Sequence, residues 1–356
     1  MRKLNKDRGS VICGESAWIA LQEQIEQLQP SQIFILVDEN THEHCLPLIV
    51  KRFEKQFDFH TLSISSGETH KTINTCLDLW AQLSAQGADR KSLLINLGGG
   101  VITDLGGFVA STYQRGIECI NIPTSLLAMV DASIGGKNGV DLGNLKNQIG
   151  IIRDPLLVLI DPDFLNTLPK EHFESGVSEM LKHGLIADES YWEEITTLDG
   201  PDHPQLEALI WRSIQIKNEI VTLDPKENGA RKALNYGHTL GHAIESYCLE
   251  QDDRPALLHG EAIAIGMVLA CYLSQHLTGL SSEVTQRVKH HIVQRYSKQN
   301  FTDQEILEIT ALTKHDKKNK YGKVLFVLLE DIGKYKLDQE VSEDLIKSAF
   351  QFYMQS

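Results

Sequence analysis

Four short apolar runs in the first half of the chain each end in polar or glycine residues, and a helical segment separates two of them. Uniformly apolar runs of this length are typical of strands that are buried on both faces. Strands that alternate with helices predict a parallel sheet, in which ligands bind beyond the carboxyl ends of the strands. The runs occupy residues 32–40, 92–100, 118–125 and 156–163, and the helical segment occupies residues 72–90.

The pattern changes after about residue 165, where long helix-like segments with few strand signals follow one another. We therefore expect an α/β protein with an N-terminal Rossmann-like parallel-sheet domain over residues 1–165 and a mainly helical domain over residues 166–356. The helical segments occupy residues 168–188, 205–223, 233–250 and 260–277.

Charge and cysteine usage narrow the class of protein. The 356 residues carry a formal net charge of -14, which argues against a general nucleic-acid binder, although a local group of Lys and Arg can still hold an anion. The apolar stretch 262–271 is too short to cross a membrane, and no apolar stretch typical of a secretory signal follows the basic N-terminus. Six cysteines without a C-x-x-C pair indicate reduced thiols and a cytoplasmic location.

Three polar loops are expected at one edge of the predicted sheet. The glycine triplet at 98–100 follows a strand and precedes a helix, where backbone N–H groups can approach a phosphate closely. It is not a G-x-G-x-x-G fingerprint, so by itself it also fits a tight strand-to-helix turn. The polar segment 65–71 and the pair Asp38 and Asn40 end two other strands. Together, the loops favour a nucleotide site over a simple turn.

The segment 130–150 is dense in polar groups and holds five glycines. Asp131, Lys137, Lys146 and Asn147 lie among these glycines. Lysines in such a segment usually belong to a solvated surface loop. Because the segment follows a strand, we interpret it as a shaped binding loop.

The segment 235–246 sets His238 and His242 four residues apart, so both imidazoles lie on one face of a helix. Taken alone, such a pair is most often a pair of core or surface histidines. His259 precedes another helix, and Glu179 lies on a third helix one turn before Lys182. A catalytic zinc site needs about three protein ligands, so the spacing offers one candidate too many and leaves the choice open.

Five segments follow one another along nearly the whole chain, at residues 98–117, 122–140, 175–184, 231–246 and 257–267. Together and in this order they resemble the 3-dehydroquinate synthase family of the sugar phosphate cyclase superfamily. The resemblance implies NAD and a divalent metal, Zn²⁺ or Co²⁺, as cofactors and a homodimer as the assembly. The implied reaction converts 3-deoxy-D-arabino-heptulosonate 7-phosphate to 3-dehydroquinate and phosphate in the shikimate pathway of aromatic amino acid biosynthesis. It runs through transient NAD oxidation, phosphate elimination, re-reduction and aldol cyclisation.

The resemblance also implies a role for individual residues. The first histidine of the G-H-x-x-G-H segment would bind the metal, and the second would be a catalytic base. The implied metal ligands are Glu179, His238 and His259, and the implied catalytic residues are His242, Glu227 and Lys182. The implied substrate contacts are Arg115, Asp131, Lys137, Asn147, Lys217, Arg231, Asn235 and Lys318. The implied NAD contacts are Asp38, Asn40, Glu68, Lys71, Gly99, Gly100, Val101, Asp104, Thr124, Ser125, Lys146, Phe164, Thr167 and Ser175.

The chain departs from the family pattern at Ser125, where threonine is usual, and at Asn138 and Asp141, where threonine and asparagine are common. Sibling cyclases that take sedoheptulose 7-phosphate or glucose 6-phosphate share the fold, NAD and the metal. We favour the heptulosonate phosphate as substrate because Lys217, Arg231 and Lys318 are the cations expected to hold its carboxylate. An iron-type alcohol dehydrogenase, which would accumulate NADH, and a non-catalytic binding protein are the other classes considered.

Overall fold

The structure is a computed structural model, and it describes residues 2–355 except 54, 144, 252–253 and 314–323. Its backbone forms two compact units. The first unit comprises Met1–Pro169 with Gly200–Ile214, and the second comprises Lys170–Asp199 with Gln215–Ser356. The division of function between residues 1–165 and 166–356 stays a prediction.

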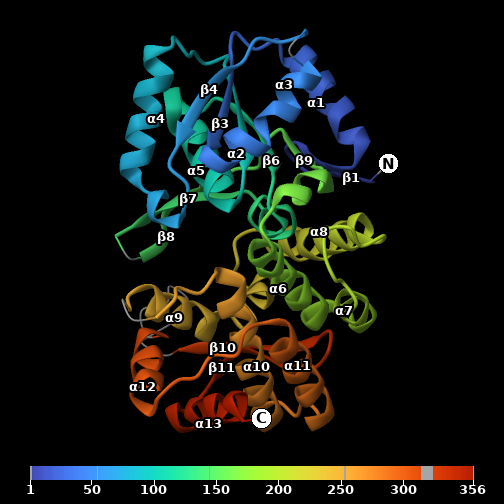
Figure 1. Cartoon of the computed structure of the whole chain (residues 1–356), viewed down its shortest axis with the longest axis vertical. Coiled ribbons are helices and arrows are strands. Elements are labelled where there is room, and N and C mark those ends of the chain that lie inside the picture. Colours follow the sequence, from blue (N-terminus) through green and yellow to red (C-terminus); the bar gives the residue numbers. More distant parts are fainter. Residues whose placement is uncertain (1, 54, 144, 252–253, 314–323, 356) are drawn as a thin grey trace. The chain divides into compact units, whose positions relative to one another are not determined.

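A seven-stranded sheet forms the centre of the first unit within the described residues (Figure 1). Its strand order is β1-β2-β9-β6-β5-β3-β4, and all neighbouring strands are parallel except β1 and β2. The four apolar runs of the sequence form β3, β5, β6 and β9, which confirms the predicted parallel sheet. The strands of this sheet are β1 Arg2–Asn5, β2 Ser10–Cys13, β3 Ile33–Asp38, β4 His60–Ile64, β5 Leu93–Gly98, β6 Glu118–Pro123 and β9 Leu157–Ile160.

Apolar side chains cover both faces of the central strands. Phe34 and Leu36 of β3 pack in one cluster with Leu79 of α4 and Leu105 of α5. Ile35 points to the opposite face and is also fully buried. This explains why the strands are uniformly apolar instead of alternating. The helices of this unit are α1 Glu15–Leu28, α2 Glu39–His44, α3 Leu46–Phe53, α4 Ile73–Ala85 and α5 Gly100–Thr112, with short helical turns η1 Glu68–His70, η2 Tyr113–Arg115, η3 Ala128–Ala132 and η4 Pro162–Thr167.

The glycine-rich segment 130–150 is mostly a β-hairpin, and its interpretation as a loop is wrong. The strands β7 (Lys137–Leu142) and β8 (Leu145–Ile152) are antiparallel, with Gly139 opposite Gly150. A Cβ atom on Gly139 would lie 2.5 Å from the Ile149 carbonyl oxygen, and a Cβ atom on Gly150 would lie 2.5 Å from the Asn138 carbonyl oxygen. These two glycines therefore allow a close approach of two strands and do not mark loop flexibility.

The second unit is mainly helical, as the sequence predicts, and it is built around α10 (His259–Leu277). This helix packs against α6, α9, α11, α13 and β10. Every residue from 262 to 271 is buried, because a helix that is apolar on all sides is stable only when other elements surround it. Across the described residues, no helix has the length and hydropathy that a membrane crossing requires.

The other elements of this unit lie on both sides of α10 in the sequence. A two-stranded antiparallel ribbon, β10 and β11, was not expected in a helical unit. The bounds are α6 Lys170–Ala187, α7 Glu189–Thr196, α8 Leu206–Leu223, η5 Ala230–Asn235, α9 His238–Leu249, α11 Ser282–Arg295, α12 Asp303–Leu312, β10 Leu325–Asp331, β11 Lys334–Glu340 and α13 Glu343–Met354. Of these, α8 belongs to the first unit up to Ile214 and to the second unit from Gln215.

Candidate active site

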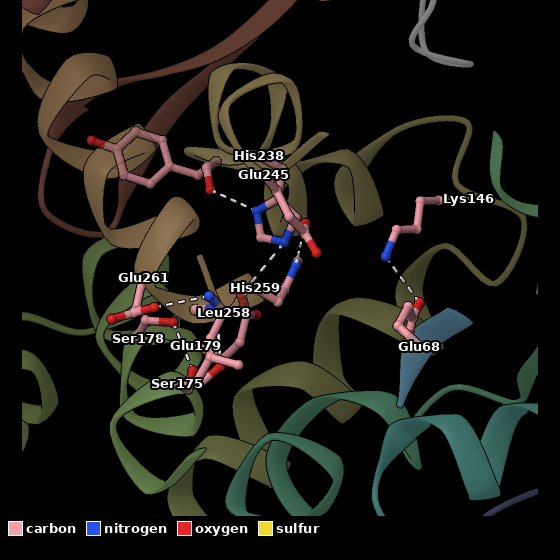
Figure 2. Close-up of polar contacts among 12 residues, drawn as sticks. Glu68, Lys146, Ser175, Ser178, Glu179, His238, Glu245, Leu258, His259 and Glu261 are labelled. Carbon is pink, nitrogen blue, oxygen red and sulfur yellow. Dashed lines mark hydrogen bonds and ion pairs between the residues drawn. The ribbon is translucent and has the colours of Figure 1, made fainter. Parts of the chain in front are cut away.

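A carboxylate and two imidazoles from three helices of the second unit face one another (Figure 2). Glu179 lies in the middle of α6, while His238 and His259 are the first residues of α9 and α10. The Glu179 Oε1 atom lies 3.4 Å from His238 Nε2 and 3.9 Å from His259 Nε2. We call Glu179, His238 and His259 the Glu–His–His cluster.

Hydrogen bonds on the far side of each ring orient the two imidazoles. The Nδ1–H group of His238 donates to the Tyr236 carbonyl oxygen at 3.1 Å, and that of His259 donates to Glu245 Oε2 at 3.1 Å. In both rings this leaves Nε2 unprotonated when the imidazole is neutral, with its lone pair on the side of Glu179. A carbonyl or carboxylate behind a histidine is the usual outer partner of a metal-binding imidazole.

The two oxygens of Glu179 have different surroundings. Lys182, also fully buried, donates to Oε2 from one turn along the same helix. Oε1 is buried and has no hydrogen-bond partner among the described residues, although it faces both imidazoles. A buried carboxylate oxygen needs compensation, because its desolvation is costly. A divalent cation bound by Oε1 and the two Nε2 atoms supplies that compensation, so the residues present fit zinc or cobalt.

His242 lies beside the Glu–His–His cluster. Its ring centroid is 5.1 Å from that of His238 and 5.6 Å from that of His259. One ring nitrogen of each of these three histidines lies within 4.8 Å of the others. The structure therefore brings together all four candidates, and the exclusion of His242 from the metal stays a prediction.

Two close glycine contacts bring together the helices that carry the Glu–His–His cluster. A Cβ atom on Gly260 would lie 2.1 Å from the Ser175 carbonyl oxygen, and one on Gly266 would lie 2.1 Å from the Gly237 carbonyl oxygen. Ser175, an expected NAD contact, is buried and accepts a hydrogen bond from the Gly260 N–H group at 2.9 Å. Its hydroxyl therefore contributes to the packing of α6 on the start of α10.

Three expected catalytic or substrate residues lie between the end of α8 and the start of α9, and a fourth lies on α8 itself. Glu227 Oε1 accepts a hydrogen bond from Asn235 Nδ2 at 2.8 Å, so these two residues are brought together. Arg231 is buried, and its Nη1 atom donates to the Pro225 carbonyl oxygen at 3.0 Å. Lys217 is buried on α8. Lys318, another expected substrate contact, lies outside the described residues.

The glycine triplet forms the turn from β5 into α5, as the sequence predicts. Gly99 is the N-cap residue and Gly100 begins the helix, so the first N–H groups of α5 have no acceptor within the helix. A Cβ atom on Gly98 would lie 2.5 Å from Ile102 Cγ1. Gly99, Gly100 and Val101 are half-buried. A helix start with partly accessible N–H groups can bind an anion such as a pyrophosphate.

A buried network lies beside this turn in the first unit. The Lys71 ammonium donates to Asp104 Oδ2 at 2.6 Å and to Asn147 Oδ1 at 2.7 Å. The Asn147 N–H group donates to Asp141 Oδ1 at 2.6 Å. Burial raises the pKa of the Asp104 carboxyl, and the Lys71 charge opposes that shift. Glu68 and Lys146 form an ion pair at 3.1 Å (Figure 2). Five expected NAD or substrate residues thus form two local groups, one around Lys71 and one made by Glu68 and Lys146.

The remaining expected NAD contacts of the first unit are more dispersed. Asp38 is the N-cap of α2 and accepts from the Thr41 N–H group at 2.8 Å, while Asn40 is exposed. Ser125 Oγ accepts from the Ala128 N–H group at 3.3 Å, and Thr124 is buried. Phe164 is buried, and its ring centroid lies 6.1 Å from that of Trp18. Thr167 is exposed.

Three expected substrate contacts also lie in the first unit. Asp131 is half-buried in η3, and Lys137 is exposed at the start of β7. Arg115 is exposed in η2 with a φ of 72°. Asn147 and Glu227 also have positive φ, at 50° and 59°. Residues other than glycine rarely adopt this backbone conformation, and it concentrates at functional sites.

Sequence reasoning did not include Glu245 or Asp224. Glu245 is seven residues after His238 and therefore on the same helix face, which is a signal that helical spacing alone provides. Asp224 precedes Pro225 and accepts backbone hydrogen bonds from residues further along the loop. An Asp-Pro pair is a turn signal, but it does not indicate which residues the turn will position.

Comparisons with known proteins identify relatives of the chain. Residues 61–175 match the 3-dehydroquinate synthase N-terminal family model, and residues 176–319 match the C-terminal model. The chain is 41% identical over 340 residues to 3-dehydroquinate synthase of Parabacteroides distasonis, covering 94% of this chain and 95% of the relative. Among solved structures it resembles 2-epi-5-epi-valiolone synthase of Streptomyces hygroscopicus with NAD⁺ and Zn²⁺ bound, at 26% identity, with a TM-score of 0.86 and 98% of each chain covered. It also resembles a 2-deoxy-scyllo-inosose synthase complexed with carbaglucose-6-phosphate, NAD⁺ and Co²⁺, at 26% identity, with a TM-score of 0.84 and 97% of each chain covered.

Proposed function

This chain belongs to the 3-dehydroquinate synthase family, and we propose from that premise how its residues carry out the reaction. The enzyme is an NAD- and divalent-metal-dependent lyase of the shikimate pathway. It converts 3-deoxy-D-arabino-heptulosonate 7-phosphate to 3-dehydroquinate and phosphate. When bound, NAD accepts a hydride from the substrate and later returns it, and the metal ion acts as a Lewis acid on a substrate oxygen.

The metal would be held by the Glu–His–His cluster. The observation that carries this assignment is the buried Glu179 Oε1 atom, which faces Nε2 of both histidines and has no hydrogen-bond partner among the described residues. Zinc sites that catalyse reactions commonly combine three protein ligands with one open position. Lys182 would keep Glu179 oriented through its Oε2 atom and contribute a positive charge beside the metal.

His242 and Glu227 would move the protons. His242 lies one helical turn after His238, so its imidazole lies beside the Glu–His–His cluster and would be near a metal held there. Oxidation of a substrate hydroxyl to a ketone acidifies the neighbouring C–H bond, which lets a base start the loss of phosphate. Asn235 donates a hydrogen bond to Glu227 Oε1 at 2.8 Å, which would orient the carboxylate for its role as a base.

The substrate carries a carboxylate and a phosphate, so cations must gather in a chain whose total charge is negative. We propose that Lys217, Arg231 and Lys318 hold the carboxylate, and that these contacts decide the choice among sugar phosphates. The further substrate contacts proposed are Arg115, Asp131, Lys137, Asn147 and Asn235.

NAD would bind the first unit through the start of α5. The backbone N–H groups of the half-buried glycine turn would donate hydrogen bonds to the pyrophosphate. The ion pair of Lys71 and Asp104 beside the turn would stabilise the conformation of the turn. Asp38, at the end of β3, is in the position that commonly binds ribose hydroxyls in parallel sheets. The other proposed contacts are Asn40, Glu68, Val101, Thr124, Ser125, Lys146, Phe164, Thr167 and Ser175.

We also propose a homodimer located in the cytoplasm. Arg115 is exposed on a turn with positive φ, which suits a side chain that enters the site of a partner subunit. Mixing Arg115→Ala subunits with Lys182→Ala subunits should restore part of the activity, because one site of each mixed dimer regains both groups. Inactive dimers that are demonstrably mixed would contradict this role.

Phosphate release from 3-deoxy-D-arabino-heptulosonate 7-phosphate tests the proposal, measured with and without a metal chelator. We expect release that depends on metal, with no net increase in NADH absorbance over many turnovers. Sedoheptulose 7-phosphate should react at least roughly a hundredfold less efficiently, because two charge-assisted hydrogen bonds to the carboxylate are not made. Equal efficiency on both substrates would refute the proposed specificity, and steady NADH production would refute the proposed chemistry.

A further inference from the structure

One aspartate organises the loop between α8 and η5. The Asp224 Oδ2 atom accepts hydrogen bonds from the Gly229 N–H group at 2.6 Å and from the Arg231 N–H group at 3.1 Å. Its Oδ1 atom accepts from the Asn228 N–H group at 3.0 Å. The Asp224 carbonyl oxygen also accepts from the Glu227 N–H group at 3.3 Å. Both the side chain and the main chain of Asp224 therefore accept hydrogen bonds from the loop that follows it.

We propose that Asp224 is a positioning residue for catalysis, which holds Glu227 and Arg231 in the geometry that acts on the substrate. This inference rests on the proposed function, since it takes Glu227 as a base and Arg231 as an anion-binding group. Asp224 itself would touch neither substrate nor cofactor. It would act through the backbone of the two residues that do.

The backbone conformation of Glu227 requires stabilising contacts, which Asp224 provides. Glu227 has a φ of 59°, in the left-handed region that residues with a side chain avoid. This conformation persists only where surrounding contacts determine it. The contact between Asp224 and Asn228 holds the residue that follows Glu227, and the Asp224 carbonyl oxygen holds Glu227 itself. Asn235 then fixes the Glu227 side chain at 2.8 Å.

An ionised carboxylate is the side chain that suits this loop. It offers only acceptors, so both oxygens can receive N–H groups at once. These hydrogen bonds, first of all the one from Gly229, hold the pKa of Asp224 below its usual range. An asparagine has one accepting oxygen, which would take the side where Gly229 and Arg231 donate, and its NH₂ group would face the Asn228 N–H group. Asp224→Asn should therefore lose the contact with Asn228 and retain weaker contacts with the other two N–H groups.

Asp224→Ala, Asp224→Asn and a matched control, Asp89→Ala, test the inference in the full-length enzyme. Asp89 is an exposed aspartate of the first unit whose carboxylate accepts from the Lys91 N–H group at 2.7 Å, and it has no proposed role in the site. Hydrogen exchange of the peptide that contains residues 224–231 reports the order of the loop. The kinetic readouts are kcat and KM for the heptulosonate phosphate, and NAD affinity and metal content show whether the other sites stay intact.

For Asp224→Ala we expect faster exchange of the loop amides and a loss of kcat/KM of roughly tenfold to a hundredfold, since displacing a reacting group by about 1 Å has effects of that size. The loss should divide into a lower kcat from Glu227 and a higher KM from Arg231. NAD affinity and metal content should be unchanged. Asp224→Asn should lie between wild type and Asp224→Ala, and Asp89→Ala should match the wild type in kinetics.

Glu227→Gln and Arg231→Met separate the two ways in which the idea can fail. If both variants lose activity while Asp224→Ala exchanges faster but keeps normal kcat and KM, the positioning role is wrong and the proposed function stands. If neither variant loses activity, the proposed roles of Glu227 and Arg231 are wrong, and the inference falls with them. Unchanged exchange in Asp224→Ala would overturn the inference directly, because the loop would not depend on the aspartate.

Discussion

The Glu–His–His cluster of the second unit and the glycine turn of the first unit are both proposed to bind a cofactor, but they are built from different groups. The Glu–His–His cluster consists of side chains whose orientation is fixed by other groups. Glu245 and the Tyr236 carbonyl oxygen orient the two histidines by hydrogen bonds. The glycine turn offers backbone N–H groups and almost no side chain, and its neighbours Lys71 and Asp104 pair with each other. A site made of oriented side chains should lose its ligand when one of those side chains is removed. A site made of backbone N–H groups should lose its ligand when the residues that support the backbone conformation are changed.

The largest effect expected from this comparison is the loss of metal from His238→Ala. Removing one of three protein ligands should weaken metal binding by more than about a hundredfold, because even the outer partners of metal ligands contribute tenfold to a hundredfold. His242→Ala should keep its metal and lose activity by roughly 10²–10⁴-fold, as expected for a general acid–base group. Metal content of the purified variants is the measurement. Retention of metal in His238→Ala together with its loss in His242→Ala would reverse the two assignments.

The second effect concerns the support of the glycine turn. Lys71→Met leaves the Asp104 carboxylate largely buried without its cation, and removing one partner of a buried pair destabilises a protein by about 3–5 kcal/mol. We expect a lower free energy of unfolding in urea together with weaker NAD binding, while the metal content stays normal. The double variant Lys71→Met/Asp104→Asn should recover part of the stability, since no unpaired charge remains. NAD affinity equal to that of the wild type would show that the pair does not shape the turn.

A smaller effect is expected from Glu245→Gln, which changes how His259 is aimed without removing a ligand. The carboxylate accepts from the His259 Nδ1–H group at 3.1 Å, and a neutral amide oxygen accepts more weakly. Metal affinity, measured by competition with a chelator, should fall by about tenfold to a hundredfold. Glu250→Gln is the control, because Glu250 is exposed just after the end of the same helix. Equal affinity in both variants would mean that Glu245 does not orient the ligand.

The smallest effect concerns thiol reactivity. Burial raises the pKa of Cys271 to about 12 and also raises that of Cys248, so the native thiols should not react with an aromatic disulfide reagent at pH 8. Cys248 lies on α9 and Cys271 on α10, the helices that begin with His238 and His259. Chelation of the metal should therefore increase the reactivity of these two cysteines slightly and leave the others unchanged. The others, all in the first unit, are Cys13, Cys45, Cys76 and Cys119.

Equal labelling of all six cysteines after chelation would contradict this separation. It would indicate that the metal stabilises the whole chain and not the second unit alone. Peptide mapping after labelling distinguishes the two results, with protein unfolded in urea as the reference in which all thiols react.

Much of the first unit follows from local patterns in the sequence. The strands β3, β5, β6 and β9 are continuous apolar runs, and both faces of such a run must be buried whatever lies further along the chain. The glycine triplet marked the turn into α5, where a Cβ atom on Gly98 would lie 2.5 Å from Ile102. The hairpin of β7 and β8 was not predicted, since Gly139 and Gly150 are needed for the close approach of the opposite strand, which local sequence does not show.

The candidate site shows the same limit of local patterns. The spacing of His238 and His242 determined that both imidazoles share a helix face, because a helix repeats every 3.6 residues. Spacing could not determine which ring nitrogens face Glu179, which comes from a different helix. That choice depends on Glu245 and the Tyr236 carbonyl oxygen, and on the glycine contacts that bring α6, α9 and α10 close together.

The sequence by itself determined the family, the parallel sheet, the helical second unit and the set of residues from which a site could be chosen. Tertiary structure decided the orientation of each side chain, the engagement of Ser175 in helix packing and the closure of the Asp224 loop. The physical reason is the range of the forces involved. Backbone sterics and hydrophobic periodicity act over a few neighbouring residues, whereas a hydrogen bond or a metal ligand needs atoms placed to within a few tenths of an ångström by packing between distant segments.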